Sequence, residues 1–467
     1  MMKKIIVITA MAVLGIAALY AQTPEDEAWA EQIRQEAETA AGADVIEEEP
    51  AEDTAMVAPV EEEPQPQAKK KGLPYPYRRI FEIGVNAGAG FSNNSVGIDD
   101  IFRQTLVINQ ELVDKIKTDG FLFDFNIENT GAFINFNTQN WGFGVTASVT
   151  GDGTFGLPKA LFTLLSEGNK NSHSSSGTID VYGAMYADTS IDIHMRFLQS
   201  KKLKISFIPS MFVPIAYVPK EDGFSYKLLM EDGMAGFSVG GAFNLYTPFS
   251  LDDMDSVDYM SALEARGFDL SLNAEYDFFS DSYDWLTAGF TVKSIPLIAS
   301  TLSYRTRISL VDEHGDPWTI LEPTDDLLGT FLDDNFDLNM PDEDDFEATH
   351  DEEEITVRRP VRFDLYANMR PLGKKLIVVR PSIGLTTNTI DKKAHFNYSL
   401  TAELNTPIFL LHLSTAYDEL IFKHGVMIGF NFRVIELDVG VDIRSRDFAQ
   451  SFSMSGAKAW VGARIGF

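Results

Sequence analysis

The sequence predicts an all-β protein: a closed antiparallel transmembrane β-barrel of about 16 strands, roughly 14 to 18, with short helices in its loops or as a plug. Three observations predict this fold. Apolar and polar residues alternate along very long segments, no apolar run in the body of the chain is long enough for a membrane helix, and short connections alternate with long ones.

The stretch from Ile179 to Phe197 shows the alternation most clearly. Its odd-numbered positions are mostly apolar, and its even-numbered positions hold Asp, Tyr, His and Arg. Side chains on a strand alternate between two faces, so the stretch specifies one apolar and one polar face. At about 3.3 Å per residue it spans roughly 60 Å, far more than a usual strand of about 5 or 6 residues. Such a strand suits a wall between lipid and water.

Composition excludes several classes of protein. The chain has 467 residues, a formal net charge of −31 and no cysteine. The negative charge repels nucleic acid phosphate, so we expect no nucleic-acid partner. Without cysteine the chain can be neither a lipoprotein nor disulfide-bonded, and its stability must come from burial and hydrogen bonding.

The N-terminus has the pattern of a secretory signal peptide. Lys3 and Lys4 precede the apolar segment Ile5–Tyr20, and Ala21 offers a small-residue cleavage point. We therefore predict a signal peptide over residues 1–21 and an exported mature protein.

The next segment, 22–77, is predicted to be an acidic, Pro- and Glu-rich disordered periplasmic tail and linker. It contains almost no aromatic residues and cannot bury enough apolar surface to order itself. Residues 22–71 could contact the cell wall or another periplasmic protein, although a solvated tail is the simpler interpretation. The barrel is predicted to occupy 78–467.

The two-residue period recurs from Phe81 almost to the end of the chain. Turn residues divide it into the predicted strands. The clearest apolar rows are Phe81 to Phe91, Phe121 to Ile127, Trp141 to Val149, Phe268 to Tyr276, Ile355 to Leu365, Phe396 to Leu404 and Ile435 to Ile443.

A soluble sandwich and a lipid-embedded barrel would both satisfy this pattern, and the connections favour the barrel. Short turns, including one at Ser294–Pro296, should alternate with long outer loops, including Phe279–Asp284, Asp418–His424 and the largest, 311–354. The segment Thr247–Gly267 breaks the rule, because it is long yet falls on the short-turn side. Either a strand is miscounted there, or a small helix caps that end.

The last ten residues, KAWVGARIGF, alternate and end in Phe467. This ending resembles the closing strand of bacterial outer-membrane β-barrel proteins, which is recognised during assembly. The resemblance is porin-like or fatty-acid-channel-like, without a subfamily. It implies residence in the outer membrane of a diderm bacterium, with outer-membrane lipid and the barrel assembly machinery as partners and Phe467 as part of the assembly signal.

Two motifs suggest ligand chemistry but have simpler explanations. The sequence GDGTFG, Gly151–Gly156, matches a dinucleotide fingerprint, yet its flanking strands alternate strictly, so we expect a Gly-rich outer loop. Asp333, Asn335 and Asp337 repeat half of a calcium loop, but Leu338 stands where that motif requires Gly. We predict a solvated acidic loop and no metal or cofactor.

The histidines do not indicate catalysis. His350 and His424 are predicted in loops, and His194, His395 and His412 on polar faces of different strands, without a partnered nucleophile or metal-ligand spacing. We therefore predict that the protein is not an enzyme.

Charged residues on the predicted inner faces are candidates for the lumen lining or a constriction. Opposed charges across a pore would set a transverse field, although each residue could simply hydrate the wall. The candidates are Arg305, Arg307, Arg358, Arg362, Asp364, Asp438, Asp442, Asp269, Glu275 and Asp277.

The leading hypothesis for function is an outer-membrane channel for passive diffusion of small solutes. One alternative is a plugged transporter of hydrophobic, lipidic substrates similar to long-chain fatty acid channels, with Ile98–Ile116 and Leu157–Leu165 folded inward as the plug. Another is a surface-exposed adhesin or structural envelope barrel. Conductance would separate these three hypotheses.

Overall fold

The molecule is described by a computed structural model of residues 1–467. The predicted signal peptide and tail fall outside the residues whose structure is described. Those residues are 79–97, 110–118, 120–138, 140–167, 174–197, 202–220, 223–231, 234–251, 262–278, 285–310, 316–324, 346–372, 376–387, 390 and 392–467.

Almost all regular structure in these residues is β-strand. The strands are β1 (Phe81–Asn93), β2 (Phe121–Asn137), β3 (Trp141–Leu157), β4 (Ser175–Phe197), β5 (Leu203–Val218), β6 (Gly223–Glu231), β7 (Met234–Thr247), β8 (Gly267–Asp277), β9 (Leu286–Ile298), β10 (Ser300–Leu310), β11 (Trp318–Thr324), β12 (Phe346–Val357), β13 (Val361–Met369), β14 (Ile377–Thr387), β15 (Ala394–Asn405), β16 (Phe409–Asp418), β17 (Ile421–Asn431), β18 (Ile435–Ser445) and β19 (Gly456–Gly466).

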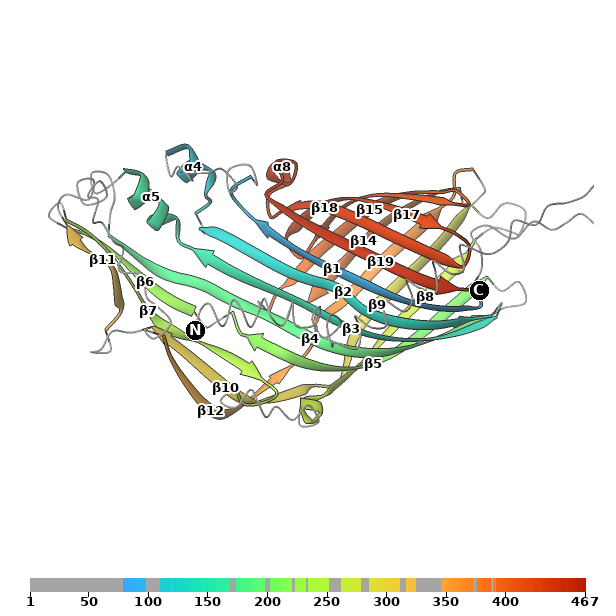
Figure 1. The fold of residues 1–467 in the computed structure, drawn as a ribbon, viewed down its shortest axis with the longest axis horizontal. Helices are drawn as coiled ribbons and strands as arrows, with labels where there is room; N and C mark the ends of the chain where they lie inside the picture. Colours follow the sequence, from blue (N-terminus) through green and yellow to red (C-terminus); the bar gives the residue numbers. More distant parts are fainter. Residues whose placement is uncertain are drawn as a thin grey trace, which may run out of the picture. The chain divides into compact units, whose positions relative to one another are not determined.

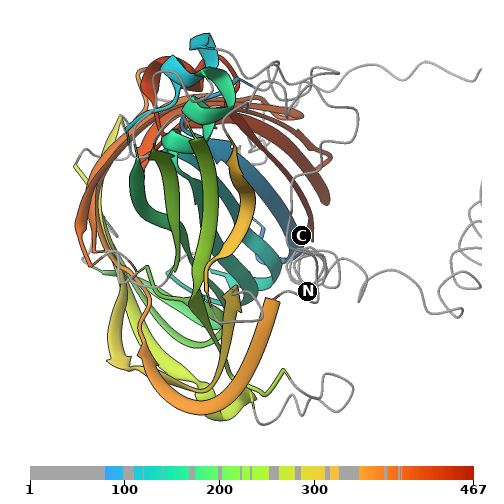
Figure 2. The ribbon, with the colours of Figure 1, turned by 90° about the vertical axis from the view of Figure 1, so that its left-hand side faces the viewer.

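The strands form one antiparallel sheet that closes on itself, as predicted. Following the described pairings from strand to strand gives β1, β2, β3, β4, β5, β8, β9, β13, β14, β15, β16, β17, β18, β19 and β1 again. These fourteen strands lie within the predicted range of 14 to 18. Figure 1 shows the tilted wall from the side, and Figure 2 shows it curving around an interior.

Closure joins the first and last strands of the barrel. β1 pairs with β19 from Glu82 opposite Gly466 to Ser92 opposite Gly456 without a register shift. The end of the barrel near Phe467 carries the short turns, and we call it the short-turn end. The opposite end, the long-loop end, carries the helices and the larger connections.

The remaining strands extend the wall at the long-loop end. There β4 pairs with β6, β6 with β7, β7 with β10 and β11, and β10 with β12. β9 and β10 together pair with β13 and β12 in nearly one register, from Arg362 opposite Lys293 to Ser300 opposite Val357. β9–β10 and β12–β13 are therefore two long, bent courses of the wall rather than four separate crossings.

Three predicted connections differ from the structure for this reason. Ser294–Pro296 was expected as a turn but lies inside β9, where Ser294 has φ 55° at an irregularity in the pairing with β8. The connection 278–285 lies at the short-turn end rather than among the outer loops, because β8 and β9 meet there. Thr247–Gly267 lies between β7 and β8, which pair one after the other with β5, and it contains a short 3₁₀ helix at Leu263–Ala265.

Other segments predicted as loops contain strands. Asp418–His424 holds only a two-residue turn, Glu419 and Leu420, both at positive φ. The range 311–354 contains β11 and most of β12. Gly151–Gly156 lies in β3, paired with β2 and β4, so the expected Gly-rich loop was wrong. His350 and His424 lie in β12 and β17.

The apolar faces of the strands lie on the outside of the barrel and the polar faces on the inside, the opposite of the arrangement in a soluble protein. The apolar row of β4 is exposed, with Ile191, Ile193, Met195 and Phe197 all between 38% and 47% accessible. The same holds for the outer faces of β13 to β19. A soluble sandwich would press these rows against one another, so their exposure excludes that alternative.

Short helices lie at the long-loop end (Figure 1). They are α4 (Gln110–Lys115), α5 (Lys159–Glu167) and α8 (Phe448–Ser451). The first two contact each other, and Lys159 Nζ donates to the carbonyl of Ile116 at 2.7 Å. Among the described residues, no helix is both long and apolar enough to span a bilayer.

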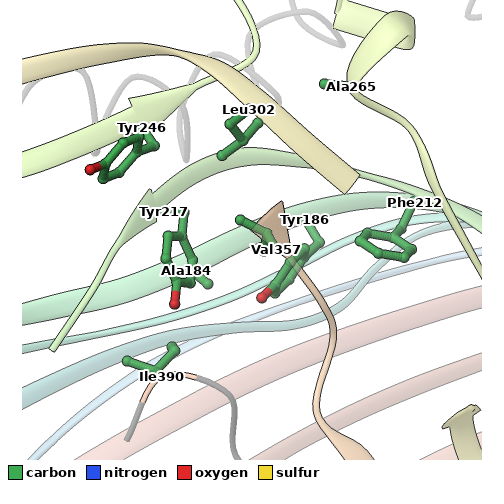
Figure 3. Packing of buried hydrophobic residues seen from close by; sticks show 9 residues of the cluster. All are labelled: Ala184, Tyr186, Phe212, Tyr217, Tyr246, Ala265, Leu302, Val357 and Ile390. Carbon is green, nitrogen blue, oxygen red and sulfur yellow. The ribbon is translucent and has the colours of Figure 1, made fainter. Parts of the chain in front are cut away.

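A buried apolar cluster lies where β5, β7, β10 and β12 come together, between the closed circuit of strands and the strands that extend it (Figure 3). Leu302, Phe212 and Val357 are almost inaccessible, and Tyr186 packs edge-on against Phe212. Ile390, between β14 and β15, completes the cluster. This packing stabilises the bends of the β9–β10 and β12–β13 courses of the wall.

We predict that Val439→Lys lowers the free energy of unfolding by about 2 to 4 kcal/mol, as charge on a lipid-facing wall does. Val439 is 56% exposed on β18, opposite Ile428 and Val461. The measurement is reversible unfolding in guanidinium with phospholipid vesicles. Val439→Leu is the control and should stay within about 1 kcal/mol. Equal stability of the two variants would show that this face does not meet lipid.

Candidate functional site

The inner face of the barrel carries a dense set of paired charges. Asp438, Asp442, Arg444 and Lys458 are each at most 8% exposed, although charged side chains are rarely buried unless they are paired. This face is the candidate functional site, because it is the surface that a solute in the lumen would meet.

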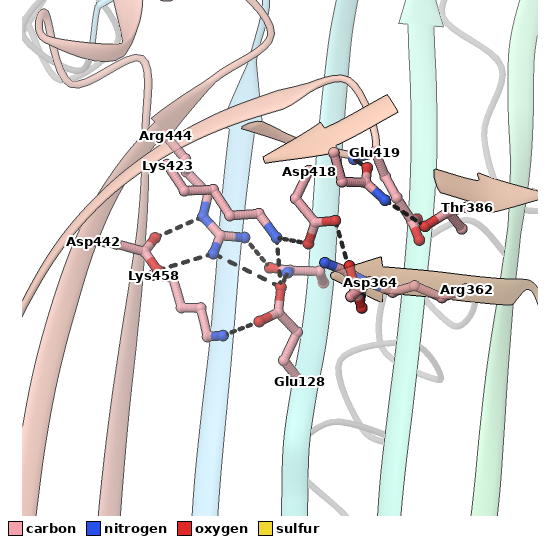
Figure 4. A network of polar contacts seen from close by, with 12 residues as sticks. Glu128, Arg362, Asp364, Thr386, Asp418, Glu419, Lys423, Asp442, Arg444 and Lys458 are labelled. Carbon is pink, nitrogen blue, oxygen red and sulfur yellow. Dashed lines mark hydrogen bonds and ion pairs between the residues drawn. The ribbon is translucent and has the colours of Figure 1, made fainter. Parts of the chain in front are cut away.

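Glu128 is the centre of the largest group of charges (Figure 4). Its carboxylate lies 3.3 Å from Lys423 Nζ and 3.9 Å from Arg444 Nη2, and it also accepts a hydrogen bond from Lys458 Nζ. Glu128 occupies a register irregularity in the pairing of β2 with β3. A bulge re-aims a side chain, so the irregularity lets this carboxylate face the cations of β17, β18 and β19.

Glycines on β1 leave space for these contacts. A Cβ on Gly90 would come within 2.6 Å of Lys458 Cβ and 2.9 Å of the Asn126 side-chain oxygen. A Cβ on Gly88 would lie 3.2 Å from the carbonyl oxygen of Glu128. The inner face of β1 is therefore bare at these two glycines, and long side chains from the neighbouring strands meet over them.

The group continues from Lys423 towards β13. Lys423 Nζ lies 3.1 Å from Asp418, whose other oxygen accepts from Arg362 at 2.7 Å, and Arg362 also donates to Asp364. We call the whole set, Glu128, Arg362, Asp364, Asp418, Lys423, Asp442, Arg444 and Lys458, the central charge network.

The network extends into the lumen rather than lying flat on the wall. β1, β19 and β18 separate β2 from β17, so Glu128 and Lys423 start about 19 Å apart along the wall at about 4.8 Å per strand. A contact at 3.3 Å across that arc requires both side chains to extend inward. The network therefore narrows the lumen.

Glu419 lies in the turn beside this network, outside the strands. Burial raises the pKa of its carboxyl, and the neighbouring charge of Asp418 raises it further, while Lys423 and Arg362 oppose the shift. Its backbone N–H donates to Asn397 Oδ1 at 3.2 Å. The turn therefore keeps one carboxyl that protonates more readily than an exposed Glu.

Arg359 forms a second charged group that the sequence did not indicate. It lies between β12 and β13, donates to Asp269 at 2.7 and 2.8 Å, and stacks 4.9 Å from the ring centre of Phe212. Its Nη1 also lies 3.7 Å from Asp188. The alternation predicted that Arg358 would face the lumen. The strand is interrupted at residues 358–360, so Arg358 is exposed and Arg359 faces the carboxylates instead.

Of the predicted lumen residues, Arg362, Asp364 and Asp442 lie in the central charge network. Asp438 instead pairs with Arg464 on the adjacent strand β19. Glu436 also pairs with Arg464, at 3.2 Å. Two charged groups therefore share the inner faces of β18 and β19.

The other predicted residues lie elsewhere. Arg305 pairs with Asp351 and Glu353 of β12, which explains how that acidic segment forms a strand. Arg307 is exposed on β10. Glu275 and Asp277 lie near the short-turn end of β8. The structure therefore divides the predicted set into separate groups and does not bring them together at one constriction.

A closed antiparallel barrel with an apolar exterior and a charged interior is an outer-membrane β-barrel protein. No protein-family model matches the chain, and no curated protein matches it.

Solved structures resemble it over most of its length. The Ralstonia pickettii toluene transporter TbuX has 7% identity and a TM-score of 0.42, covering 84% of this chain and 90% of its own. The P. putida toluene transporter TodX has 9% identity and a TM-score of 0.39, covering 83% and 89%. A Pseudomonas aeruginosa FadL homologue has 10% and 0.38, covering 84% and 90%. Likeness at this level says nothing about cargo.

We predict that Glu128→Gln lowers the free energy of unfolding by about 1 to 2 kcal/mol, because Lys423, Lys458 and Arg444 lose their shared counter-charge. A fully buried pair would lose about 3 to 5 kcal/mol, but Glu128 is 34% exposed and partly screened. The measurement is the same vesicle-bound unfolding assay. Glu111→Gln on α4 removes an exposed carboxylate as the control and should change stability little. Equal losses in both variants would contradict a structural role for the network.

Proposed function

We propose that the protein is an outer-membrane channel for the passive diffusion of small solutes. The observation that carries the proposal is the charged inner wall, organised around Glu128 and Arg359, inside a closed barrel of fourteen strands. Opposed charges held away from the wall suit a water-filled passage, whereas a barrel with a purely structural role has no need of them. Transport of this kind needs no catalysis.

A second candidate is transport of hydrophobic substrates. The buried cluster of Phe212, Leu302, Tyr186 and Val357 favours it, because apolar side chains gather on the inner side of the wall. The cluster is packed against itself, however, and its members are at most 8% exposed apart from Tyr182 and Ile355, which pack against it. It therefore offers a substrate little surface, and we place the solute channel first.

The orientation and assembly of the barrel form part of the proposal. We infer that the short-turn end faces the periplasm, where the tail 22–77 would lie, and that the signal peptide 1–21 directs export. Phe467 is 77% exposed, and its backbone N–H donates to the Phe81 carbonyl at 3.0 Å. The Phe467 ring lies 5.6 Å from the ring of Phe81, and a closing strand with an exposed terminal aromatic ring supports recognition by the barrel assembly machinery.

We predict that the refolded protein forms ohmic pores in planar bilayers and that Ser399→Trp lowers their single-channel conductance by roughly a factor of two. Ser399 lies on the inner face of β15, hydrogen-bonded to Ser382 at 2.6 Å. A bulky ring there would obstruct the lumen.

The matched control is the next residue. Leu400 is 46% exposed on the outer face, so Leu400→Trp should leave conductance unchanged. A wild-type protein that folds but conducts no ions would overturn the solute channel. If it instead speeds entry of a toluene-like hydrocarbon into vesicles, the second candidate stands.

A further inference from the structure

A cationic pocket lies on the inner wall at the short-turn end, apart from the central charge network. It has a volume of about 220 Å³ and is formed where β4, β5, β8, β9 and β13 end. Its lining residues are Arg196, Lys202, Lys204, Glu275, Asp277, Thr287, Asn368 and Arg370.

The strand register explains why these side chains meet. Arg196 of β4 is paired with Lys204 of β5, and Lys204 is paired with Glu275 of β8. Residues directly opposite in an antiparallel sheet project to the same face. Arg196 belongs to the polar row of β4, whose apolar row is exposed on the outside, so all three side chains face the lumen.

The carboxylates of the pocket already have partners. Asp277 accepts from Thr287 Oγ1 at 2.6 Å and lies 3.6 Å from Arg196. Glu275 accepts from the Tyr366 hydroxyl at 2.8 Å. These contacts hold both acids in place against the wall.

The lysines are different. Within the part of the chain that the structure describes, neither Lys202 nor Lys204 forms an ion pair or a side-chain hydrogen bond. The lining holds four cations, Arg196, Lys202, Lys204 and Arg370, against two acids, a surplus of two positive charges. The whole chain has a net charge of −31, so this local surplus is the reverse of the overall balance.

We propose that this pocket binds small oxyanions, carboxylates or phosphate, at the short-turn mouth of the lumen, with Lys202 and Lys204 as the charges that hold them. A volume of about 220 Å³ is far above the roughly 10 to 15 Å³ that one water needs, so a short dicarboxylate fits. Thr287 and Asn368 supply neutral hydrogen-bonding groups beside the cations. Ammonium and guanidinium groups bind such oxygens through charge-assisted hydrogen bonds.

The inference rests on the proposed channel function and narrows it. A cationic site at one mouth raises the local concentration of anions there and opposes the entry of cations. The channel should therefore favour small anionic solutes over cations of the same size, despite the acidity of the protein as a whole.

The first experiment is calorimetric titration of the refolded, detergent-solubilised protein with succinate, with inorganic phosphate and with neutral succinamide. Succinate tests binding of a carboxylate, and inorganic phosphate tests binding of a phosphate. We expect binding of at least one of them and none of succinamide. The double variant Lys202→Gln/Lys204→Gln should weaken binding by at least about tenfold, which corresponds to about 1.4 kcal/mol, because it removes both charges that hold the anion.

Two further variants keep the result interpretable. Lys202→Arg/Lys204→Arg retains both charges and should retain binding. Lys392→Gln/Lys393→Gln removes two exposed lysines between β14 and β15, away from the pocket, and should bind like the wild type. Each variant is first shown to be folded by its heat-modifiable mobility on a gel. Equal binding by the two Gln double variants, or no binding by the wild type, would overturn the site.

The second experiment separates this inference from the channel itself. Reversal potentials are measured in planar bilayers under a potassium chloride gradient, and we expect the Lys202→Gln/Lys204→Gln pore to shift towards cation selectivity. A pore that conducts while the protein binds no oxyanion overturns the anion site and leaves the channel. Binding by a protein that never conducts overturns the channel alone.

Discussion

Closure of the sheet is the constraint on which the rest of the structure depends. Backbone N–H and C=O groups have no partner in hydrocarbon, so a strand edge facing lipid would be prohibitively costly. The uninterrupted pairing of β1 with β19 removes that edge. Once the sheet is closed, each strand has one face outside and one inside, and the alternation of the sequence becomes a separation of lipid-facing from lumen-facing residues.

That separation determines how charge must be arranged. Side chains on the inner wall cannot spread into bulk water, so Arg444, at 1% exposure, is held by Asp442 and Asn126 rather than by solvent. Pairing across several strands also needs positions without side chains, and Gly88 and Gly90 supply them. Glycines therefore shape the lumen lining as much as the charged residues do.

The period of two was enough to predict the closed barrel and which face of most strands meets lipid. It could not predict where the period slips. One slip is the bulge at which Glu128 turns towards the cations, and another is the strand break that places Arg359, rather than Arg358, beside the carboxylates. Both depend on partners that are distant in the sequence, which local alternation does not specify. For the same reason Ser294–Pro296 resembled a turn, although pairing with β8 and β13 keeps it within one course of the wall.

The two groups of lumen charges have different physical consequences. In the central charge network every cation has a carboxylate within ion-pair distance, so its field is largely cancelled, and it mainly narrows and stiffens the passage. At the short-turn end both acids have partners, whereas Lys202 and Lys204 form no ion pair with any of the residues that the structure describes, so positive charge is in excess there. A solute would meet a neutral constriction and a positive mouth, and it is the uncompensated charge, not the larger network, that can discriminate between ions.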